Sequence, residues 1–197
     1  DDASTNAETI STLKSYAQKH ANIKLNLLSE NGHISKASNA ALSMVTSDYV
    51  LLLDHDDTLP AHTLSFFAKA ITDNTKAKVL YGDEDKIDEQ GNRHQPHFKS
   101  GWNPDLLLSQ NYICHPVVYK TSVLKKIGGF RVGVEGSQDH DLLLRATGGL
   151  KHGEVVHLPF ILYHWRVIEN STASDASAKS YTTDAVSYTH LTLPTSR

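Results

Sequence analysis

Short apolar runs alternate with amphipathic segments through the first half of the chain. Runs at residues 49–53 and 79–81 predict buried strands, and residues 23–28 predict a shorter one. Apolar residues at helical spacing predict three helices: one after a capping box at Thr5 and Glu8 that reaches about His20, one at 34–45, and one from Pro60 to about Asp73. Strands that alternate with helices predict an α/β fold with a largely parallel sheet in this half.

The second half predicts a more mixed arrangement. A turn at residues 89–92 predicts a hairpin, and paired glycines end predicted helices at 121–127 and 138–147. Ser137 is a good N-cap for the latter helix. The remaining predicted elements are a helix at 103–108 and strands at 116–119, 155–158 and 161–165. We therefore expect a mixed sheet flanked by helices.

Length and composition restrict the class of protein. A chain of 197 residues holds one ordinary α/β domain, and a net charge of −3 with scattered basic residues gives no case for nucleic-acid binding. The single cysteine, Cys114, excludes an internal disulfide framework and indicates a reducing compartment, the cytoplasm. No apolar run approaches the roughly 20 residues that span a bilayer, which leaves peripheral attachment to the inner face of a membrane open.

Both ends of the chain have unusual sequences. The chain opens on Asp1 and Asp2 with no preceding strand, as if cut where a strand-to-helix turn begins. Residues 169–185 form a polar tail. Residues 186–197 resemble a translated sequencing adaptor, although their Thr, Tyr and Val would also suit a genuine strand. We expect the domain to occupy residues 1–168.

The segment YVLLLDHDD at residues 49–57 carries the strongest indication of chemistry. Asp54, Asp56 and Asp57 directly follow an apolar run that predicts a strand buried on both faces. Carboxylates this close repel one another, and a divalent cation or a cationic ligand relieves the repulsion. The alternative is a polar loop in which Asp57 or Thr58 caps the next helix, but a cap requires one carboxylate, not three.

Acidic residues also follow other apolar elements or stand at their ends. These groups are Asp1-Asp2, Asp83-Glu84-Asp85 and Gln138-Asp139-His140-Asp141. Carboxylates placed repeatedly at element ends predict one shared acidic cleft. A metal-bridged diphosphate fits such a cleft, because Mg²⁺ and Mn²⁺ prefer carboxylate and phosphate oxygens.

Six motifs follow one another in a characteristic order from Asp1 to about Arg166. They are DDAST, GHISKASNAALSMVTSDYVLLLDHDD, YGDEDKID, NPDLLLSQNYICHPVVYK, GGFRVGVEGSQDHDLLLR and YHWR. This series resembles family-2 glycosyltransferases of the GT-A fold, an α/β fold, and in particular the bacterial type associated with O-antigen and other surface polysaccharides. Such enzymes begin with a strand of the type VSIIIPTYN, so the resemblance implies that the first strand of the fold is missing here.

The resemblance implies a nucleotide-sugar donor, carried on UDP, dTDP or GDP. Asp2 matches the residue that contacts the nucleotide base. Asp54 and Asp56 match the DxD pair, which orients the donor ribose and holds Mn²⁺ or Mg²⁺ on the diphosphate, where the cation acts as a Lewis acid. Asp57 either shares the metal ion or caps the next helix.

Asp139, in SQDHD, matches the general base of inverting members of the family. A sugar hydroxyl is a poor nucleophile, so a carboxylate must take its proton as it attacks the anomeric carbon. The alternative is that Asp139 and Asp141 are acidic residues of a first helical turn, favoured there by the helix dipole. We expect catalysis for Asp139, the dipole role for Asp141 and an exposed His140.

The motif YHWR supplies two further candidates. His164 matches a C-terminal histidine that approaches the metal ion or the diphosphate in some GT-A enzymes. The alternative is a packed, hydrogen-bonded histidine. Arg166 can pair with phosphate oxygens of the donor.

Four residues are candidates for binding the acceptor. Trp102 and Tyr112 offer aromatic faces that suit a pyranose ring, and the Asn111 amide suits its hydroxyls, although Trp102 can equally belong to the core. Asp85 is a candidate for the floor of the acceptor cleft, with a solvated hairpin as the alternative.

The resemblance thus implies an inverting, metal-assisted sugar transfer to a saccharide or lipid-linked saccharide acceptor in surface polysaccharide biosynthesis. One alternative is a haloacid-dehalogenase-like phosphatase, because Asp54 to Leu59 also fits its DxDxT motif, with Asp54 as nucleophile and Asp56 as acid/base. The segment from Thr58 to Tyr81 leaves little room for the other motifs of that class. A second alternative is a binding fragment with little activity, because of the missing strand.

Overall fold

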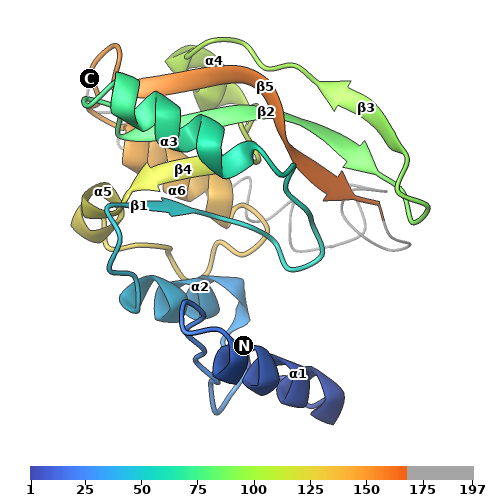
Figure 1. Cartoon of the computed structure of the whole chain (residues 1–197). Helices are drawn as coiled ribbons and strands as arrows, with labels where there is room; N and C mark the ends of the chain where they lie inside the picture. Colours follow the sequence, from blue (N-terminus) through green and yellow to red (C-terminus); the bar gives the residue numbers. More distant parts are fainter. Residues whose placement is uncertain (168–197) are drawn as a thin grey trace.

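The computed structural model describes residues 1–167. The predicted polar tail and the predicted adaptor-derived segment lie outside the described residues, as does the last residue of the predicted domain. Figure 1 shows the chain as a central sheet with helices on both sides.

One long strand, β2 (Val79–Ile87), organises the sheet. Along one side, its first half pairs with β4 (Val117–Lys120) and its second half with β3 (Arg93–His97). Along the other side it pairs with β5 (Val155–Arg166). The short strand β1 (Tyr49–Leu51) pairs with β4 and with no other strand among residues 1–167.

The sheet is mixed, as predicted, but less parallel than the alternation of strands and helices suggested. Only β2 and β5 pair in parallel, whereas β1–β4, β4–β2 and β2–β3 are antiparallel. The reason is that β4, which comes later in the chain, lies between β1 and β2. Both strands run in the same direction without being neighbours, and periodicity cannot reveal such an insertion.

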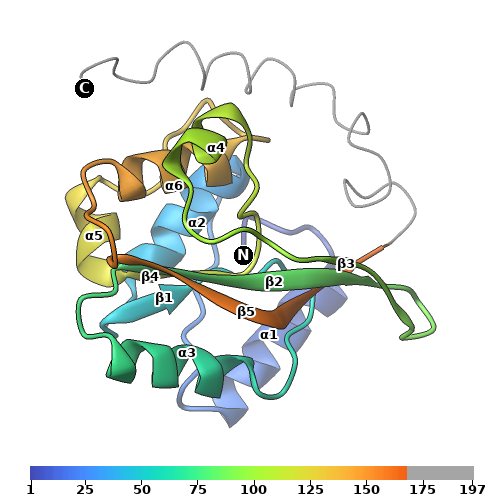
Figure 2. The same ribbon diagram turned by 90° about the horizontal axis from the view of Figure 1, so that it is seen from above.

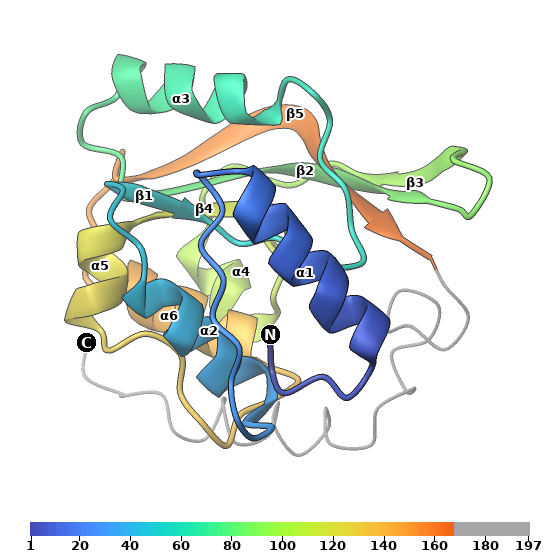
Figure 3. The ribbon, with the colours of Figure 1, turned by 60° about the horizontal axis from the view of Figure 1, so that its bottom comes forward.

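Residues 1–167 form six helices. They are α1 (Ala7–Lys19), α2 (His33–Ser43), α3 (Thr63–Asp73), α4 (Pro104–Ser109), α5 (Thr121–Lys126) and α6 (Gln138–Thr147). Figure 2 shows α3 on one face of the sheet and α2, α4, α5 and α6 on the other. Helix α1 buries none of its residues and lies outside these layers (Figure 3).

Alternating side chains of the strands build two hydrophobic cores, one on each face. In β2, Val79 and Tyr81 contribute to the core against α4, α5 and α6, whereas Leu80 contributes to the core against α3. Strand β4 repeats this alternation, because Val118 joins the α3 side. The period of two in burial is what a sheet covered on both faces produces.

Several predicted elements differ from the structure. Residues 23–28 form no strand. Asn26 and Leu28 bond to Asp1, and Ile23 bonds to the carbonyl of His20, but these bonds do not pair the segment with a strand of the described sheet. The residues predicted as two strands near the C-terminal end form the single strand β5, which keeps its pairing with β2 through register shifts. Strand β1 is half-buried rather than buried on both faces, because it pairs with β4 alone.

Two helix starts also differ from the predictions. The N-cap of α1 is Asn6 rather than Thr5, and its side chain accepts hydrogen bonds from the backbone of Glu8 and Thr9. Helix α3 begins at Thr63 after His62, so neither Asp57 nor Thr58 caps it. The carboxylates that follow β1 therefore have no capping role.

Within residues 1–167, every helix is too short or too polar to cross a membrane.

Candidate active site

The loop that follows β1 carries three carboxylates in different environments. The side chains of Asp54 and Asp56 are 44% and 31% exposed, whereas Asp57 is buried. The backbone N–H of Asp57 donates to the carbonyl of Asp54 at 3.2 Å, which closes a tight turn. This turn presents two carboxylates to solvent and directs the third inward.

Asp57 is held by the end of β5. Its carboxylate accepts hydrogen bonds from the Tyr163 hydroxyl at 2.5 Å and from the backbone N–H of Arg166 at 2.8 Å. Burial raises the pKa of Asp57, and these two hydrogen bonds oppose that shift. Both carboxylate oxygens of Asp57 thus accept a hydrogen bond within the protein. That Asp57 is also a metal ligand remains a prediction.

Arg166 reaches the same loop with its side chain. Its Nε donates to the backbone carbonyl of Asp56 at 2.8 Å, which places the guanidinium beside the turn. Of the predicted donor-binding residues, Arg166, Asp54 and Asp56 are therefore brought together. The predicted contact of Arg166 with phosphate oxygens remains a prediction.

Sequence reasoning missed His115, which lies next to Asp54. Its ring is buried, its Nε2 lies 3.5 Å from Oδ2 of Asp54, and it stacks on the ring of Tyr163 with centroids 5.1 Å apart. The Trp165 ring contacts the His115 ring edge-on. A search for acidic groups alone overlooked this histidine. His115 lies two residues before β4 and Asp54 three residues after β1, and because these two strands pair antiparallel, both residues lie at the same edge of the sheet.

Asp139 extends from the first turn of α6 into the same region. It is half-buried, and Gln138 donates to its Oδ2 at 2.9 Å. Burial raises the pKa of Asp139, the positive charge of protonated His115 lowers it, and the negative charge of Asp54 raises it. A carboxylate with a raised pKa is a stronger base once ionised.

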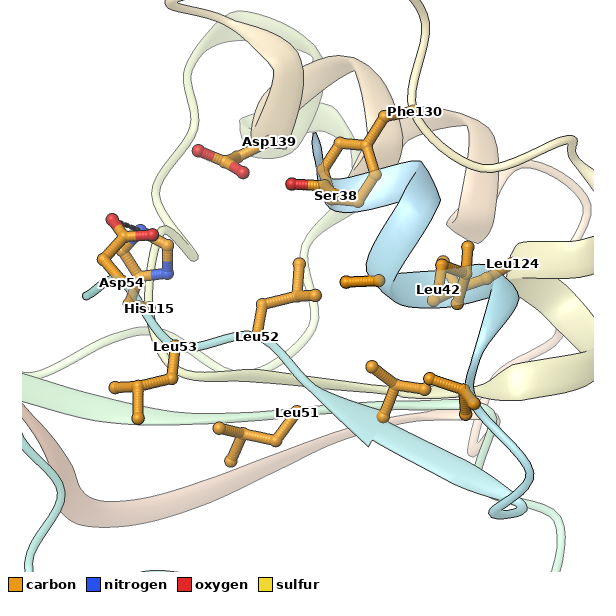
Figure 4. Close-up of a pocket in the computed structure, with 13 residues that line it drawn as sticks. Ser38, Leu42, Leu51, Leu52, Leu53, Asp54, His115, Leu124, Phe130 and Asp139 are labelled. Atoms are coloured by element: carbon orange, nitrogen blue, oxygen red, sulfur yellow. Dashed lines mark ion pairs between the residues drawn. The ribbon is translucent and has the colours of Figure 1, made fainter. Parts of the chain in front are cut away.

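Asp54, His115 and Asp139 line one pocket of about 310 Å³, at the lower end of the range for small-molecule sites. Figure 4 shows Asp54 and His115 on one side of this pocket, Asp139 above them, and Leu42 and Leu124 on the opposite side. The apolar lining comes from α2, from β1 with the residues after it, and from Leu124 and Phe130. The pocket combines a polar end suited to charged groups with an apolar wall.

The predicted acceptor residue Asp85 is buried and paired on both sides. His164 Nδ1 lies 2.5 Å from its Oδ1, and Arg93 Nε donates to its Oδ2 at 2.6 Å. The alternative interpretation, in which Asp85 lies in a solvated hairpin, is therefore wrong. The role of Asp85 in acceptor binding remains a prediction.

His164 is a packed, hydrogen-bonded histidine, as the alternative interpretation proposed. The bond from Nδ1 to Asp85 fixes the orientation of the ring and engages only one of its two nitrogens. Metal-binding histidines commonly have such a carboxylate behind them, so the two interpretations of His164 are compatible.

The other acceptor candidates lie among backbone contacts or in the core. Tyr112 is buried, and its hydroxyl accepts a hydrogen bond from the backbone N–H of Asn103 at 3.0 Å. Asn111 accepts one from Cys114 at 3.2 Å, and Trp102 packs half-buried against the core. Each of these side chains already serves the fold, and acceptor binding remains a prediction for all three.

Asp2 does not line the pocket that contains Asp54 and Asp139. Its carboxylate accepts a hydrogen bond from the backbone N–H of Gly32 at 2.7 Å, at the start of α2. Its predicted contact with the nucleotide base remains a prediction.

Two neighbours of Asp139 differ from expectation. His140 is buried rather than exposed and bonds to the carbonyl of Leu107 at 2.7 Å. Asp141 is buried and paired with Arg131 and Arg145 at 3.1 and 2.7 Å, so its main partners are side chains rather than the helix dipole. Both residues attach α6 to neighbouring segments, whereas Asp139 lines the pocket.

The residues present fit a metal ion that is bound jointly with a ligand. Residues 1–167 contain no cluster of three or more His, Cys, Asp or Glu side chains that would enclose an ion. Mg²⁺ and Mn²⁺ on nucleotides, however, take one or two protein carboxylates and complete their shell with phosphate oxygens and water. The partly exposed carboxylates of Asp54 and Asp56 match that requirement.

The architecture is that of GT-A glycosyltransferases. Residues 1–349 of TarS from S. aureus, in complex with UDP-GlcNAc, match with a TM-score of 0.74 and 21% identity, over 96% of this chain and 54% of that one. The mannosyltransferase PcManGT from Pyrobaculum calidifontis, in complex with GDP-Man and Mn²⁺, matches with a TM-score of 0.59 and 17% identity, over 96% and 59% of the two chains.

The family follows from the sequence comparison. The model of glycosyl transferase family 2 matches residues 1–128, so this chain belongs to that family. It is 40% identical over 185 residues to the uncharacterized protein y4gI of Sinorhizobium fredii and 37% identical over 174 residues to the O-antigen biosynthesis protein RfbC of Myxococcus xanthus. The matches cover 94% and 88% of this chain but only 20% and 13% of those proteins.

Proposed function

We propose that the protein transfers a sugar, with inversion and with the help of a divalent cation, from a nucleotide-diphosphate donor to a saccharide or lipid-linked saccharide acceptor. The observation that carries the proposal is the pocket in which Asp54 and Asp139 converge from elements 85 residues apart in the sequence (139 − 54). One carboxylate follows a strand and faces solvent, and the other is half-buried at a helix start. Their environments differ as the two proposed roles require.

Asp139 takes the role of general base in this proposal. In an inverting transfer, the acceptor hydroxyl forms a bond to the anomeric carbon, the bond from that carbon to the diphosphate breaks, and Asp139 receives the hydroxyl proton. Its raised pKa, caused mainly by burial, favours this step because it strengthens the base.

Asp54 and Asp56 hold the donor diphosphate in this proposal, through Mn²⁺ or Mg²⁺. The cation would supply Lewis-acid stabilisation of the departing nucleoside diphosphate. Arg166, fixed at the same loop by the Asp56 carbonyl, contributes a positive charge for phosphate oxygens. His164 adds a ring nitrogen to the same region.

The biological setting is proposed from the relatives. One of them is an O-antigen biosynthesis protein, which favours surface polysaccharide as the product. The solved neighbours were determined with UDP-GlcNAc and with GDP-Man, which favours a UDP- or GDP-linked donor, and a dTDP-linked donor is the third member of the proposal. Transfer would take place in the cytoplasm, with peripheral attachment to the membrane that carries a lipid-linked acceptor.

The phosphatase interpretation is excluded by the family to which the chain belongs. The Asp54 side chain faces the His115 ring, whose Nε2 lies 3.5 Å from its Oδ2.

The test uses the complete natural protein, a panel of nucleotide sugars and Mn²⁺. Asp139→Asn removes the base, so we expect sugar transfer to fall by a factor of about 100 or more while donor binding by calorimetry stays near that of the wild type. Asp56→Ala removes a cation ligand, so Mn²⁺-dependent donor binding should weaken.

Matched controls separate these roles from general damage. Asp105→Asn changes an exposed acidic residue in the first turn of another helix, and Asp48→Ala changes an exposed one directly before β1. Both should behave like the wild type. Near-normal turnover by Asp139→Asn would remove it as the base, and unchanged Mn²⁺-dependent binding by Asp56→Ala would contradict the metal role.

A further inference from the structure

One buried tyrosine joins both ends of the acidic turn. Tyr163, in β5, is fully buried, and its hydroxyl donates to Oδ2 of Asp57 at 2.5 Å. The hydroxyl oxygen of Tyr163 also accepts a hydrogen bond from the backbone N–H of Asp54 at 3.3 Å. A single hydroxyl therefore fixes the first and the last carboxylate-bearing residues of the turn.

The backbone of β5 reinforces this attachment. Thr58 and His164 exchange two hydrogen bonds, at 3.1 and 2.9 Å, and the Arg166 N–H donates to Asp57. All these partners come from one short stretch at the end of β5. The conformation of the turn thus depends on a strand more than 100 residues further along the chain.

The ring of Tyr163 adds a second route to Asp54. It stacks on His115 at a centroid distance of 5.1 Å and an interplanar angle of 18°. Nε2 of His115 lies 3.5 Å from Oδ2 of Asp54. The Tyr163 hydroxyl therefore holds the backbone of Asp54, and the Tyr163 ring supports His115, which faces the Asp54 side chain.

The Tyr163 hydroxyl is the donor in its bond to Asp57, because a tyrosine keeps its proton at neutral pH. Loss of this hydroxyl would leave a buried carboxylate oxygen and a backbone N–H without their shared partner. A buried polar group without a partner is unfavourable, so the turn would have to move.

We propose that Tyr163 is a positioning residue, which holds Asp54 and Asp56 in the arrangement that receives the diphosphate of the nucleotide sugar. The inference rests on the proposed function for the identity of the ligand. Tyr163 itself is buried behind the turn and acts through Asp57, Asp54 and His115. Residues that orient metal ligands from behind typically alter metal affinity or activity by 10- to 100-fold.

The test compares Tyr163→Phe with Tyr81→Phe in the complete natural protein. Each change removes one buried tyrosine hydroxyl, but that of Tyr81 donates to the Ser100 carbonyl, away from the turn. We expect Tyr163→Phe to weaken Mn²⁺ and donor binding about tenfold or more by calorimetry, and to leave the midpoint of thermal unfolding close to that of Tyr81→Phe. Asp57→Asn, which changes the partner carboxylate, should weaken binding as well, and the double variant should lose less than the sum.

A second measurement tests the positioning without any ligand. Hydrogen–deuterium exchange of a peptide covering residues 52–60 should be faster in Tyr163→Phe than in the wild type and unchanged in Tyr81→Phe. Unaltered exchange, or equal loss of donor binding in both tyrosine variants, would overturn the proposal. If the wild-type protein binds no nucleotide sugar, the proposed function fails, and the exchange result still decides whether Tyr163 positions the turn.

Discussion

At the scale of single residues, burial rather than residue type separates the roles of the carboxylates. Asp54 and Asp56 are partly exposed, whereas Asp57, next to Asp56 and three residues after Asp54, is enclosed by Tyr163 and Arg166. Asp139 lies between these extremes, and burial raises its pKa. Four aspartates that look equivalent in the sequence thus differ in chemistry because of their surroundings.

The raised pKa of Asp139 predicts a pH-dependent effect on stability. When a carboxyl group has a higher pKa in the folded protein than in the unfolded chain, the protein becomes less stable as the pH rises. The reason is that the group ionises more easily in the unfolded chain. Asp139→Asn removes the ionisable group, so its unfolding midpoint should exceed that of the wild type at pH 7.5.

The difference should shrink as the pH falls to about 4, the ordinary pKa of an aspartate, and below it, because the carboxyl group is then increasingly protonated in both states. Thermal unfolding of both proteins between pH 3.5 and 8 measures it, with Asp105→Asn as the exposed control. A lower midpoint for Asp139→Asn at pH 7.5 would contradict the cause assigned to the pKa shift. The variant would then be both inactive and less stable.

At the scale of elements, a side-chain amide attaches α2 to the segment after α5. Asn39 Nδ2 donates to the carbonyl of Phe130, and Asn39 Oδ1 accepts the N–H of Phe130, both at 2.8 Å. Phe130 also lines the pocket, as does α2. The close approach depends on Gly129, because a Cβ there would lie only 2.3 Å from Asn39 Oδ1.

We therefore expect alanine at two adjacent glycines to lower the free energy of unfolding by different amounts. Gly128 and Gly129 both have a positive φ, of 77° and 69°, so alanine at either position carries a backbone penalty of about 1–2 kcal/mol. Only Gly129→Ala also displaces Asn39, which endangers two hydrogen bonds of about 1 kcal/mol each. Chemical denaturation should show the larger loss for Gly129→Ala, whereas equal losses would mean that Asn39 can move without penalty.

At the scale of the whole molecule, a buried lysine connects the sheet with the segment that carries His115. The side chain of Lys99 is 0% exposed, and its Nζ contacts Glu84 of β2 and the backbone carbonyls of Ile113 and His115. Burial lowers the pKa of Lys99, and the negative charge of Glu84 opposes that shift. The ammonium thus holds together β2 and the turn that brings His115 to Asp54.

We expect the substitution Lys99→Met to lower the stability of the protein strongly. The change leaves Glu84 buried without its ammonium, and removing one partner of a buried ion pair typically destabilises by about 3–5 kcal/mol. Chemical denaturation measures this loss. Lys78→Met is the control, because the ion pair of Lys78 with Glu154 is partly exposed and worth about 1 kcal/mol or less. A loss no larger than that of the control would mean that Glu84 finds other donors.

Most helices and strands could be predicted from the sequence, because each has its own periodicity or cap. Helix α6, ended by paired glycines, and the hairpin between β2 and β3 are examples. The prediction of a strand at residues 23–28 failed because a strand requires a neighbouring strand, and the backbone bonds of these residues in the described structure go to Asp1 and His20. Pairing is a property of the folded chain, and local pattern does not contain it.

The sequence by itself determined the family and the acidic motifs, because both depend on the order of residues along the chain. Only the tertiary structure decided that Asp57 faces inward, that Asp139 enters the pocket of Asp54, and that His115 and Tyr163 support them. The physical reason is distance in sequence. The groups that set burial, charge and hydrogen bonding around Asp54 come from segments about 60, 85 and 110 residues away, and only folding brings them together.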